Sequence, residues 1–304
     1  MLGEVCYWIL NMSIMAAFMG LIVMLIRQIR AIPRRVSVFL WIIPFVRMTV
    51  PVGLSNKYSL MTLISKFTTR TVTVFEPADD LKFSTSNTIM LADSYSPLTF
   101  KLSRMEMVFE VAGFIWIVIA CALLIALMIL YITTKRGISD AKHLEQNIYL
   151  SGKVDSPAVY GITRPKIILP ESYQDKDLKY IIKHEKTHIR RLDNLWRIMG
   201  FFAAAVHWFN PLSWIFLKAF LTDIELACDE MAISGLETEE RKDYARTLLN
   251  STRSKSVLVS AFGGAKVRTR IENVLSYKRM TLFSGIGFAV LILFIVFALI
   301  TNAG

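Results

Sequence analysis

The stretch "HEKTH" places two imidazoles and a carboxylate at a spacing that suits metal chemistry. His184 and His188 lie four residues apart, with Glu185 directly after the first. On a helix, residues i and i+4 share one face, so both rings can bind a single zinc ion. Glu185 is then placed to act as general base toward the water that zinc activates. The simpler alternative is a basic surface helix that carries two histidines.

A third ligand must come from elsewhere in the chain. The other two histidines are His143 and His207, so a carboxylate is the stronger candidate. In "IELACDE", Glu225 and Asp229 are again four residues apart. Glu225 suits a metal ligand, and Asp229 suits a hydrogen-bond acceptor that fixes the tautomer of a ligand imidazole. By spacing alone, an acidic solvent-facing helix surface explains this pair equally well.

The uncharged run 198–217 decides whether Glu225 can reach the histidines. It has 20 residues, and a single membrane crossing of that length separates its ends by roughly 30 Å. Its middle reads "HWFNP", where Asn210 suits a helix N-cap and Pro211 the first helical position. We therefore predict a helical hairpin over 189–226, which returns Glu225 to the side of the histidine pair.

The turn of this hairpin contains His207 and several aromatic residues. We expect His207 to be a turn residue with a satisfied hydrogen bond, and a transition-state donor is the alternative role. Trp208, Phe209 and Trp214 are expected to dip into the membrane interface or to pack against transmembrane helices.

The segment before the histidine pair predicts a small sheet followed by a helix. Residues 147–170 contain short β-branched runs separated by Gly and Pro, which predicts two or three strands. From Asp175 onward the pattern is helical, and Leu178, Ile181 and Ile182 fall on one face. The histidine motif lies on this helix.

Apolar runs predict a membrane protein. Mean hydropathy is +0.47 and only 19% of residues are charged, whereas soluble domains have roughly 25% charged residues. Each run is long enough to cross a bilayer, which takes about 20 helical residues. The uncharged runs are 5–26, 111–134 and 281–304, and a further run, 36–54, is interrupted by Arg47. The expected division of the chain is two transmembrane helices in 1–54 with a short cytoplasmic loop at 27–35, an extracellular loop at 55–107, a third transmembrane helix at 108–132, a cytoplasmic domain at 133–280 and a fourth transmembrane helix at 281–301.

Basic residues set the expected orientation. Loop 27–35 has four arginines and no acid, and region 133–280 has 24 Lys/Arg against 17 Asp/Glu. Loop 55–107 is nearly balanced, with six basic and five acidic residues. Short basic loops stay in the cytoplasm, so both termini are expected outside and region 133–280 inside. The net charge of +11 then reflects orientation and attraction to anionic membrane lipid, and we expect no direct nucleic-acid contact.

Several motifs in this order strongly resemble the membrane zinc-peptidase family of the BlaR/MecR sensor-transducers. They are "SPAVYGITRPKIILP", "HEKTHIRRLDN", "HWFNP", "DIELACDE" and "RTRIENVL". The resemblance implies that His184, His188 and Glu225 bind zinc and that Glu185 is the catalytic base. It also implies an α-helical polytopic membrane protein with four transmembrane helices and a cytoplasmic α+β gluzincin-like domain. Members of the best-known type continue into an acylatable penicillin-binding sensor domain, which we expect this chain to lack because it ends directly after the last apolar run.

The histidine motif predicts a zinc metalloendopeptidase. The resemblance implies that it acts in transmembrane signalling, in an antibiotic or cell-envelope stress response, and cuts a winged-helix transcriptional repressor in the cytoplasm. The chain itself is the alternative substrate, and the chain could form a homodimer. Two alternatives remain. The first is a general membrane peptide-processing metallopeptidase, and the second is a non-catalytic signalling or immunity protein.

Overall fold

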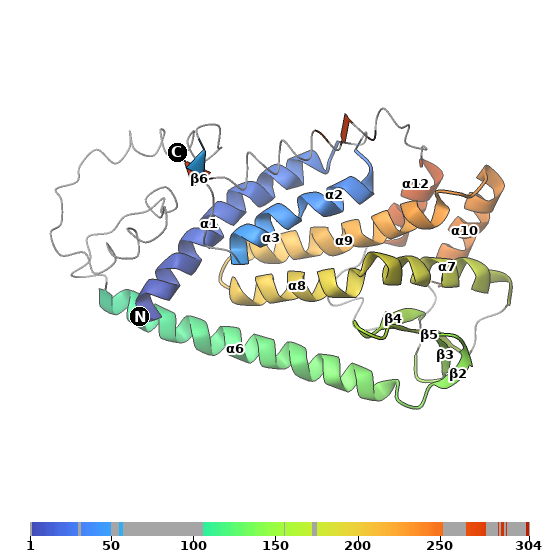
Figure 1. Cartoon of the computed structure of the whole chain (residues 1–304), viewed down its shortest axis with the longest axis horizontal. Coiled ribbons are helices and arrows are strands. Elements are labelled where there is room, and N and C mark those ends of the chain that lie inside the picture. Colours follow the sequence, from blue (N-terminus) through green and yellow to red (C-terminus); the bar gives the residue numbers. More distant parts are fainter. Residues whose placement is uncertain are drawn as a thin grey trace.

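Long helices make up most of the structure and run side by side along the long axis of the molecule (Figure 1). The computed structural model describes residues 2–29, 32–49, 55–56, 106–154, 156–171, 175–251 and 266–277, together with positions 285, 287, 288, 290, 302 and 303. The helices are α1 Leu2–Ile26, α2 Arg34–Leu40, α3 Ile42–Thr49, α6 Glu106–Gly137, α7 Asp175–Arg191, α8 Asp193–Val206, α9 Pro211–Ile233, α10 Thr238–Ser251 and α12 Val267–Leu275.

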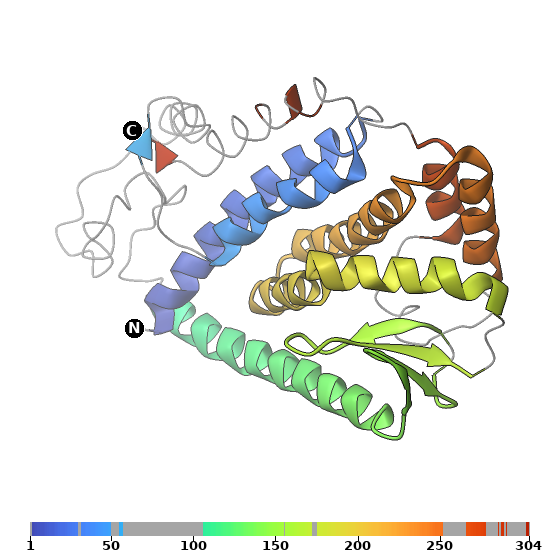
Figure 2. The ribbon, with the colours of Figure 1, turned by 45° about the vertical axis from the view of Figure 1, so that its right-hand side comes forward.

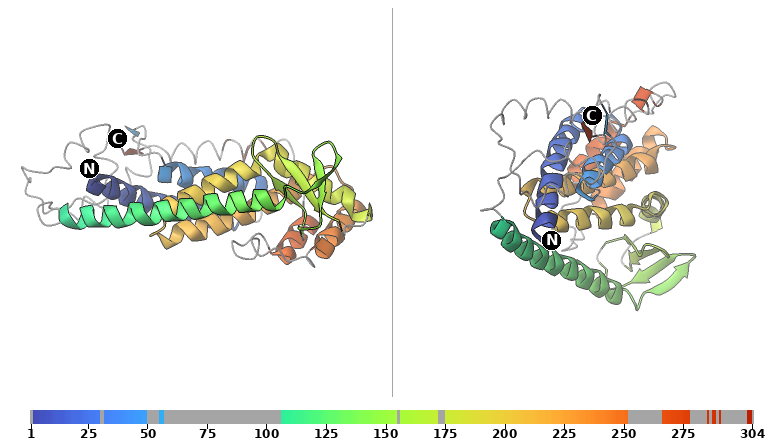
Figure 3. Two further views of the ribbon diagram at one scale, coloured as in Figure 1. Left: turned by 90° about the horizontal axis from the view of Figure 1, so that it is seen from below. Right: turned by 60° about the vertical axis from the view of Figure 1, so that its left-hand side comes forward.

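Two of these helices are long and apolar enough to cross a membrane, namely α1 and α6. About half of α1 is buried against other helices, whereas most side chains of α6 are exposed. Figure 3 shows α6 running along the edge of the molecule, and it contacts α1 and α8. An exposed apolar helix of this length is what a lipid-facing span requires. α6 extends a few residues beyond the predicted bounds 108–132 at both ends.

The second apolar run forms two short helices within the described residues instead of one long helix. α2 ends at Leu40 and α3 begins at Ile42, with Trp41 between them. Pro44 explains the break, because proline has no N–H to donate to the carbonyl of Leu40 and its ring clashes with that carbonyl. Arg47, which interrupts the apolar run in the sequence, lies within α3 and does not break that helix.

Helices α8 and α9 form a hairpin that reaches in among the apolar helices (Figure 1). Asn210 caps α9, since its side chain accepts a hydrogen bond from the N–H of Leu212 at 2.9 Å, and Pro211 is the first helical residue. At the tip of the hairpin, Phe209 packs with side chains of α1 and α6. Trp116 of α6 donates to the carbonyl of Val206 at 2.7 Å. The first helix of the hairpin starts at Asp193, four residues later than the predicted start at 189.

A four-stranded sheet covers α7 on one side (Figure 2). Its strands lie in the order β2-β3-β5-β4, with β3 and β5 parallel and the other pairs antiparallel. They are β2 Lys142–Glu145, β3 Ile148–Ser151, β4 Ala158–Tyr160 and β5 Lys166–Pro170. Ile167 and Leu169 are fully buried and pack with Ile181 of α7, which fixes the helix on the sheet. Segment 147–170 contains the three strands β3 to β5, and β2 is an additional strand before it.

Two expected regions fall largely outside the described residues. They are the extracellular loop at 55–107 and the fourth transmembrane helix at 281–301. From the first, β1 Ser55–Asn56 pairs in parallel with β6 Asn302–Ala303 near the end of the chain. Four membrane spans therefore remain a prediction.

Candidate metal centre

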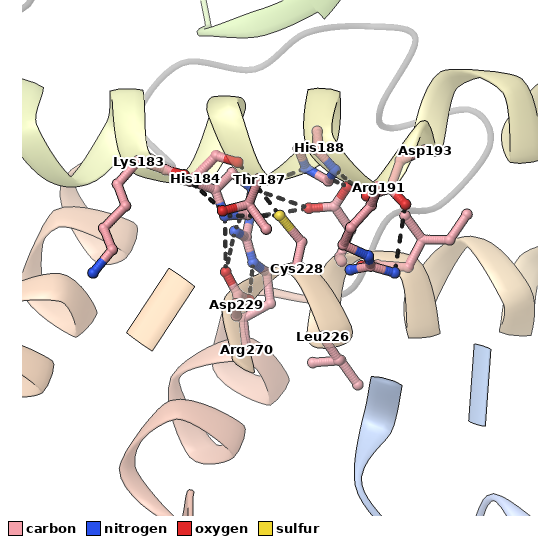
Figure 4. A network of polar contacts seen from close by, with 12 residues as sticks. Lys183, His184, Thr187, His188, Arg191, Asp193, Leu226, Cys228, Asp229 and Arg270 are labelled. Carbon is pink, nitrogen blue, oxygen red and sulfur yellow. Dashed lines mark hydrogen bonds and ion pairs between the residues drawn. The ribbon is translucent and has the colours of Figure 1, made fainter. Parts of the chain in front are cut away.

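Helix α7 carries both histidines of the motif on the side that faces α9 (Figure 4). His184 and His188 are only 8% and 5% exposed. Their Nε2 atoms lie 3.0 Å apart. The neighbouring face of α7 packs on the sheet through Ile181, so the helix that carries the two imidazoles is held between the sheet and α9. This position argues against a basic surface helix that contains histidines by chance.

Helix α9 brings Glu225 to the same point. Its Oε2 atom lies 3.7 Å from His184 Nε2, and its Oε1 atom lies 3.7 Å from His188 Nε2. Ligand atoms about 2.0–2.2 Å from a tetrahedral zinc ion lie roughly 3.3–3.5 Å from one another. The observed separations of 3.0, 3.7 and 3.7 Å bracket that range. The three side chains therefore fit one zinc ion.

Carboxylates hold both rings from behind. His188 Nδ1 lies 2.6 Å from Asp193 Oδ2. His184 Nδ1 lies 2.9 Å from the hydroxyl of Tyr244, which donates to Asp229 Oδ1 at 2.7 Å, and 3.2 Å from Asp229 Oδ1 itself. With a proton on each Nδ1, the two Nε2 lone pairs face each other and repel unless a cation lies between them. This is the donor arrangement of a metal site.

Asp193 reaches His188 because the chain breaks between α7 and α8. Leu192 has φ 56° and ψ 35°, a left-handed conformation that is uncommon for residues other than glycine. In an unbroken helix, a residue five positions after His188 would point about 140° away from it. The break turns the fully buried Asp193 back toward the histidine.

Glu185 lies on the part of α7 that borders β4. Its side chain is 7% exposed. α7 contacts β4, and burial and the negative charge of Glu185 raise the pKa of Tyr160 on that strand above its ordinary value. A small apolar pocket opens beside His188 between β4 and the α7–α8 junction. It is lined by Val159, Gly161, Ile162, Pro165, His188, Ile189, Leu192, Asn194 and Leu195.

Arginines contact two carboxylates of the centre, Asp229 and Glu225. Arg270 of α12 makes two 2.8 Å hydrogen bonds to Asp229, and its Nη2 lies 3.2 Å from His184 Nε2. Arg197 of α8 donates to Glu225 Oε1 at 2.5 Å. Both guanidinium groups favour ionised carboxylates at this site.

The electrostatics of the centre favour a cation between the imidazoles. Burial raises the pKa of Asp229, but Arg270 and His184 outweigh this effect and lower it to about 2. Burial lowers the pKa of His188, but Cys228, Glu225 and the Asp193 hydrogen bond raise it to about 9. Asp229 is therefore ionised at neutral pH. The negative groups around His188 stabilise a positive charge on its ring, and a bound metal ion would displace the Nε2 proton and take over that charge.

Cys228 is a second candidate for the third ligand position. Its sulfur and the donor atoms of His184 and His188 lie within 4.8 Å of one another. However, Sγ is 3.6 Å from Nδ1 of His184, the nitrogen that faces Tyr244, and its thiol donates to the His184 carbonyl at 3.4 Å. Glu225 instead faces the Nε2 atoms of both rings, so its position suits the ligand role better.

The remaining two histidines lie away from the pair. His207 follows the last residue of α8, about 20 Å along the helix from Asp193. It is fully buried, and its Nε2 lies 2.8 Å from the carbonyl of Met48. His143 is exposed on β2 and contacts the carbonyl of Gln146.

Sequence reasoning missed four residues that touch the centre. Tyr244 and Arg270 come from α10 and α12, and no local spacing links them to the histidine motif. Arg197 and Asp193 follow the motif closely, but their contacts depend on the break at Leu192. The acid directly after the "HIRRL" segment was the one available signal for Asp193.

Comparison with known proteins identifies relatives of this chain. The methicillin resistance mecR1 protein of Staphylococcus aureus is 30% identical over 119 residues, which cover 38% of this chain and 20% of that protein. Regulatory protein BlaR1 of Bacillus licheniformis is 30% identical over 135 residues, which cover 41% of this chain and 22% of that protein. Regulatory protein BlaR1 of Staphylococcus aureus is 29% identical over 132 residues, covering 40% and 23% of the two chains.

The alignments thus span only about a fifth of the length of these curated relatives. A family model matches far more of this chain. The model described as BlaR1 peptidase M56 covers residues 7–274, which include most of α1, all of α6, the sheet and the whole candidate metal centre. This chain therefore belongs to the BlaR1 peptidase M56 family.

Proposed function

We propose that this chain is a membrane-embedded zinc metallopeptidase that cuts a cytoplasmic protein during transmembrane signalling. The observation that carries the proposal is the convergence of His184, His188 and Glu225 from two helices, at distances that suit one zinc ion. Family membership supports peptidase chemistry, and two long apolar helices support a place in the membrane.

In this proposal each residue has a distinct task. Zinc bound by His184, His188 and Glu225 would activate water and polarise the scissile carbonyl. Glu185 takes a proton from the attacking water and passes it to the leaving amine. Asp229 and Asp193 hold the imidazoles in the tautomer that leaves Nε2 free for the metal.

The proposed location follows from charge and from the hairpin. The metal centre lies in the part of the chain whose excess of Lys and Arg favours the cytoplasm. The hairpin formed by α8 and α9 links this centre directly to the apolar helices α1 and α6. We propose four membrane spans, with both termini outside and the peptidase domain at the inner membrane surface.

The proposed substrate is a transcriptional repressor of winged-helix type or the chain itself. Relatives carry the names "regulatory protein" and "methicillin resistance" protein, which supports signalling in response to antibiotic or cell-envelope stress.

The test is the variant Glu185→Gln of the full chain. It is expressed in the membranes of its native host, so that the natural protein substrate is present. We expect the variant to keep its bound zinc and to lose cleavage by at least about 100-fold, because general-base catalysis contributes this much or more. Mass spectrometry of membrane and cytoplasmic fractions identifies fragments that depend on Glu185, and metal analysis measures the zinc.

Glu239→Gln is the matched control, since Glu239 is exposed on α10 and pairs with Lys242 of the same helix. Its fragments and zinc content should equal those of the wild type. Fragments that persist in Glu185→Gln, or a wild-type protein that binds no zinc, would contradict the proposal. The first outcome favours a non-catalytic signalling role, and fragments of many unrelated membrane peptides favour general processing.

A further inference from the structure

A buried ion pair lies directly behind the proposed ligand Glu225. Asp223 of α9 is fully buried. Arg27, just after the end of α1, donates to both of its oxygens, with Nε at 2.9 Å and Nη2 at 2.8 Å. The indole N–H of Trp41 donates to the same carboxylate at 2.9 Å. A bidentate pair of a guanidinium and a carboxylate fixes the orientation of the two groups as well as the distance between them.

The geometry of α9 turns this pair toward the first apolar helix while Glu225 faces the histidines. Successive helical residues are about 100° apart, so Asp223 and Glu225 point in nearly opposite directions. Asp223 and Glu230, seven positions apart, share one side, and Glu225 and Asp229 share the other. The last turns of α9 thus have a metal-facing side and a side held by other segments.

Glu230 makes the second attachment on that side. Its oxygens accept the backbone N–H groups of Arg34 at 3.0 Å and Arg35 at 3.3 Å, at the start of α2. Pro33, the residue before α2, provides no side-chain cap. Glu230 therefore supplies from α9 the anion that the N-terminus of α2 lacks.

The two attachments join into one network. The guanidinium of Arg34 donates to the carbonyl of Arg27 at 2.8 Å and lies 3.9 Å from Asp223. Arg35 donates to the hydroxyl of Tyr277 at 3.2 Å, just beyond α12. α12 in turn carries Arg270 into the metal centre. The described residues of the arginine loop, defined here as 27–29 and 32–35, thus contact α9 and the residue Tyr277 just beyond α12, and both of these helices deliver side chains to the centre.

We infer that Arg27 and Asp223 are positioning residues for Glu225, and that the arginine loop transmits the position of α1 to the metal centre. This inference rests on the proposed function and extends it to regulation. Because packed and paired elements shift between discrete arrangements, a movement of α1 against α9 rotates or translates Glu225 relative to the histidines. The arginines of loop 27–35, which we expect to set membrane orientation, would then also position α9.

The test uses Co²⁺ as the metal probe with the full chain in lipid nanodiscs. Arg27→Gln and Asp223→Asn each remove the ion pair, and Arg27→Lys keeps the charge but loses the fork. We expect Co²⁺ affinity to fall about tenfold in the first two variants, at the low end for groups outside the ligand set. The visible absorption bands of bound Co²⁺ should also shift, because they report ligand geometry, whereas helical circular dichroism stays unchanged.

The double variant Arg27→Gln/Asp223→Asn should lose much less than the two single losses multiplied, because the groups act as a pair. Arg246→Gln is the matched control. Arg246 is exposed on α10 and donates to Asp243 of the same helix at 3.0 Å. It should leave affinity and spectrum at wild-type values. If Asp223→Asn fails to fold, the partly exposed Arg27 variants decide the question.

The experiment distinguishes failure of this inference from failure of the proposed function. Wild-type protein that binds Co²⁺, with variants that match it in affinity and spectrum, overturns the inference and leaves the proposed function intact. Wild-type protein that binds no Co²⁺ overturns both.

Discussion

Each imidazole of the metal centre is oriented by a carboxylate that does not itself face the metal position. Asp193 serves His188, and Asp229 serves His184 both directly and through Tyr244. Such partners fix the ring tautomer and raise the basicity of the ligand nitrogen. Neighbouring side chains thus hold the proposed metal-binding imidazoles in place.

Replacement of Asp193 tests whether its carboxylate orients His188. Asp193→Asn keeps the size of the side chain but presents a weaker, neutral acceptor to His188 Nδ1. We expect zinc affinity to fall about 10–100-fold, the usual cost of losing such a partner, in a competition assay with a chromophoric chelator. Asp243→Asn is the control, since Asp243 is exposed and pairs with Arg246 on its own helix. Equal affinities in all three proteins would mean that Asp193 does not orient the ligand.

At the scale of elements, α9 is the helix on which the others converge. It packs on α1, α2, α7, α8 and α12. Close approach to α1 depends on Gly20, because a Cβ there would lie 2.1–2.6 Å from ring atoms of Phe216. Phe216 in turn packs with Trp41 at the break between α2 and α3. A small residue thus permits the contact that sets the position of the ligand helix.

Gly20→Ala tests this packing. The added methyl group overpacks the contact with Phe216, which should cost about 1–3 kcal/mol of stability and lower the thermal unfolding temperature in detergent. Gly137→Ala controls for the gain in helix propensity, because a Cβ at Gly137 meets nothing within 4 Å. Partial recovery in Gly20→Ala/Phe216→Leu would assign the loss to this contact. An unfolding temperature equal to that of the control would exclude it.

For the whole molecule, the arrangement of apolar surface indicates how the chain lies in a membrane. α6 exposes most of its apolar side chains, whereas α1 is partly covered by α3, α6 and α9. The sheet follows α6 in the chain and lies close to the end of that helix (Figure 2). This layout agrees with a membrane metalloprotease.

Cysteine labelling in intact cells tests the proposed orientation. In a background with Cys6 and Cys121 replaced by serine, Lys153→Cys should react with a membrane-impermeant maleimide only after lysis. Lys153 has an exposed side chain in the region that we propose to be cytoplasmic. Asn87→Cys, in the proposed extracellular loop, should react in intact cells and serves as the accessibility control. Labelling of position 153 in intact cells would place the peptidase domain outside.

The sequence by itself determined the local parts of this protein. The four-residue spacing puts His184 and His188 on one side of a helix, since that geometry depends only on neighbouring residues. Asn210 and Pro211 mark where α8 and α9 meet for the same reason. The run 36–54 was expected to form one transmembrane helix, and its break between α2 and α3 was not predicted. Strands before α7 were also readable from short β-branched runs.

Only the tertiary structure decided which distant groups meet at the centre. Tyr244, Arg270 and Arg197 approach the histidines and carboxylates from three helices. Asp193 joins them because one leucine adopts a left-handed conformation. The pairing of Arg27 with Asp223 spans 196 positions of the chain. Such contacts follow from how helices pack, which depends on the shapes of many side chains together and leaves no periodic signal in the sequence.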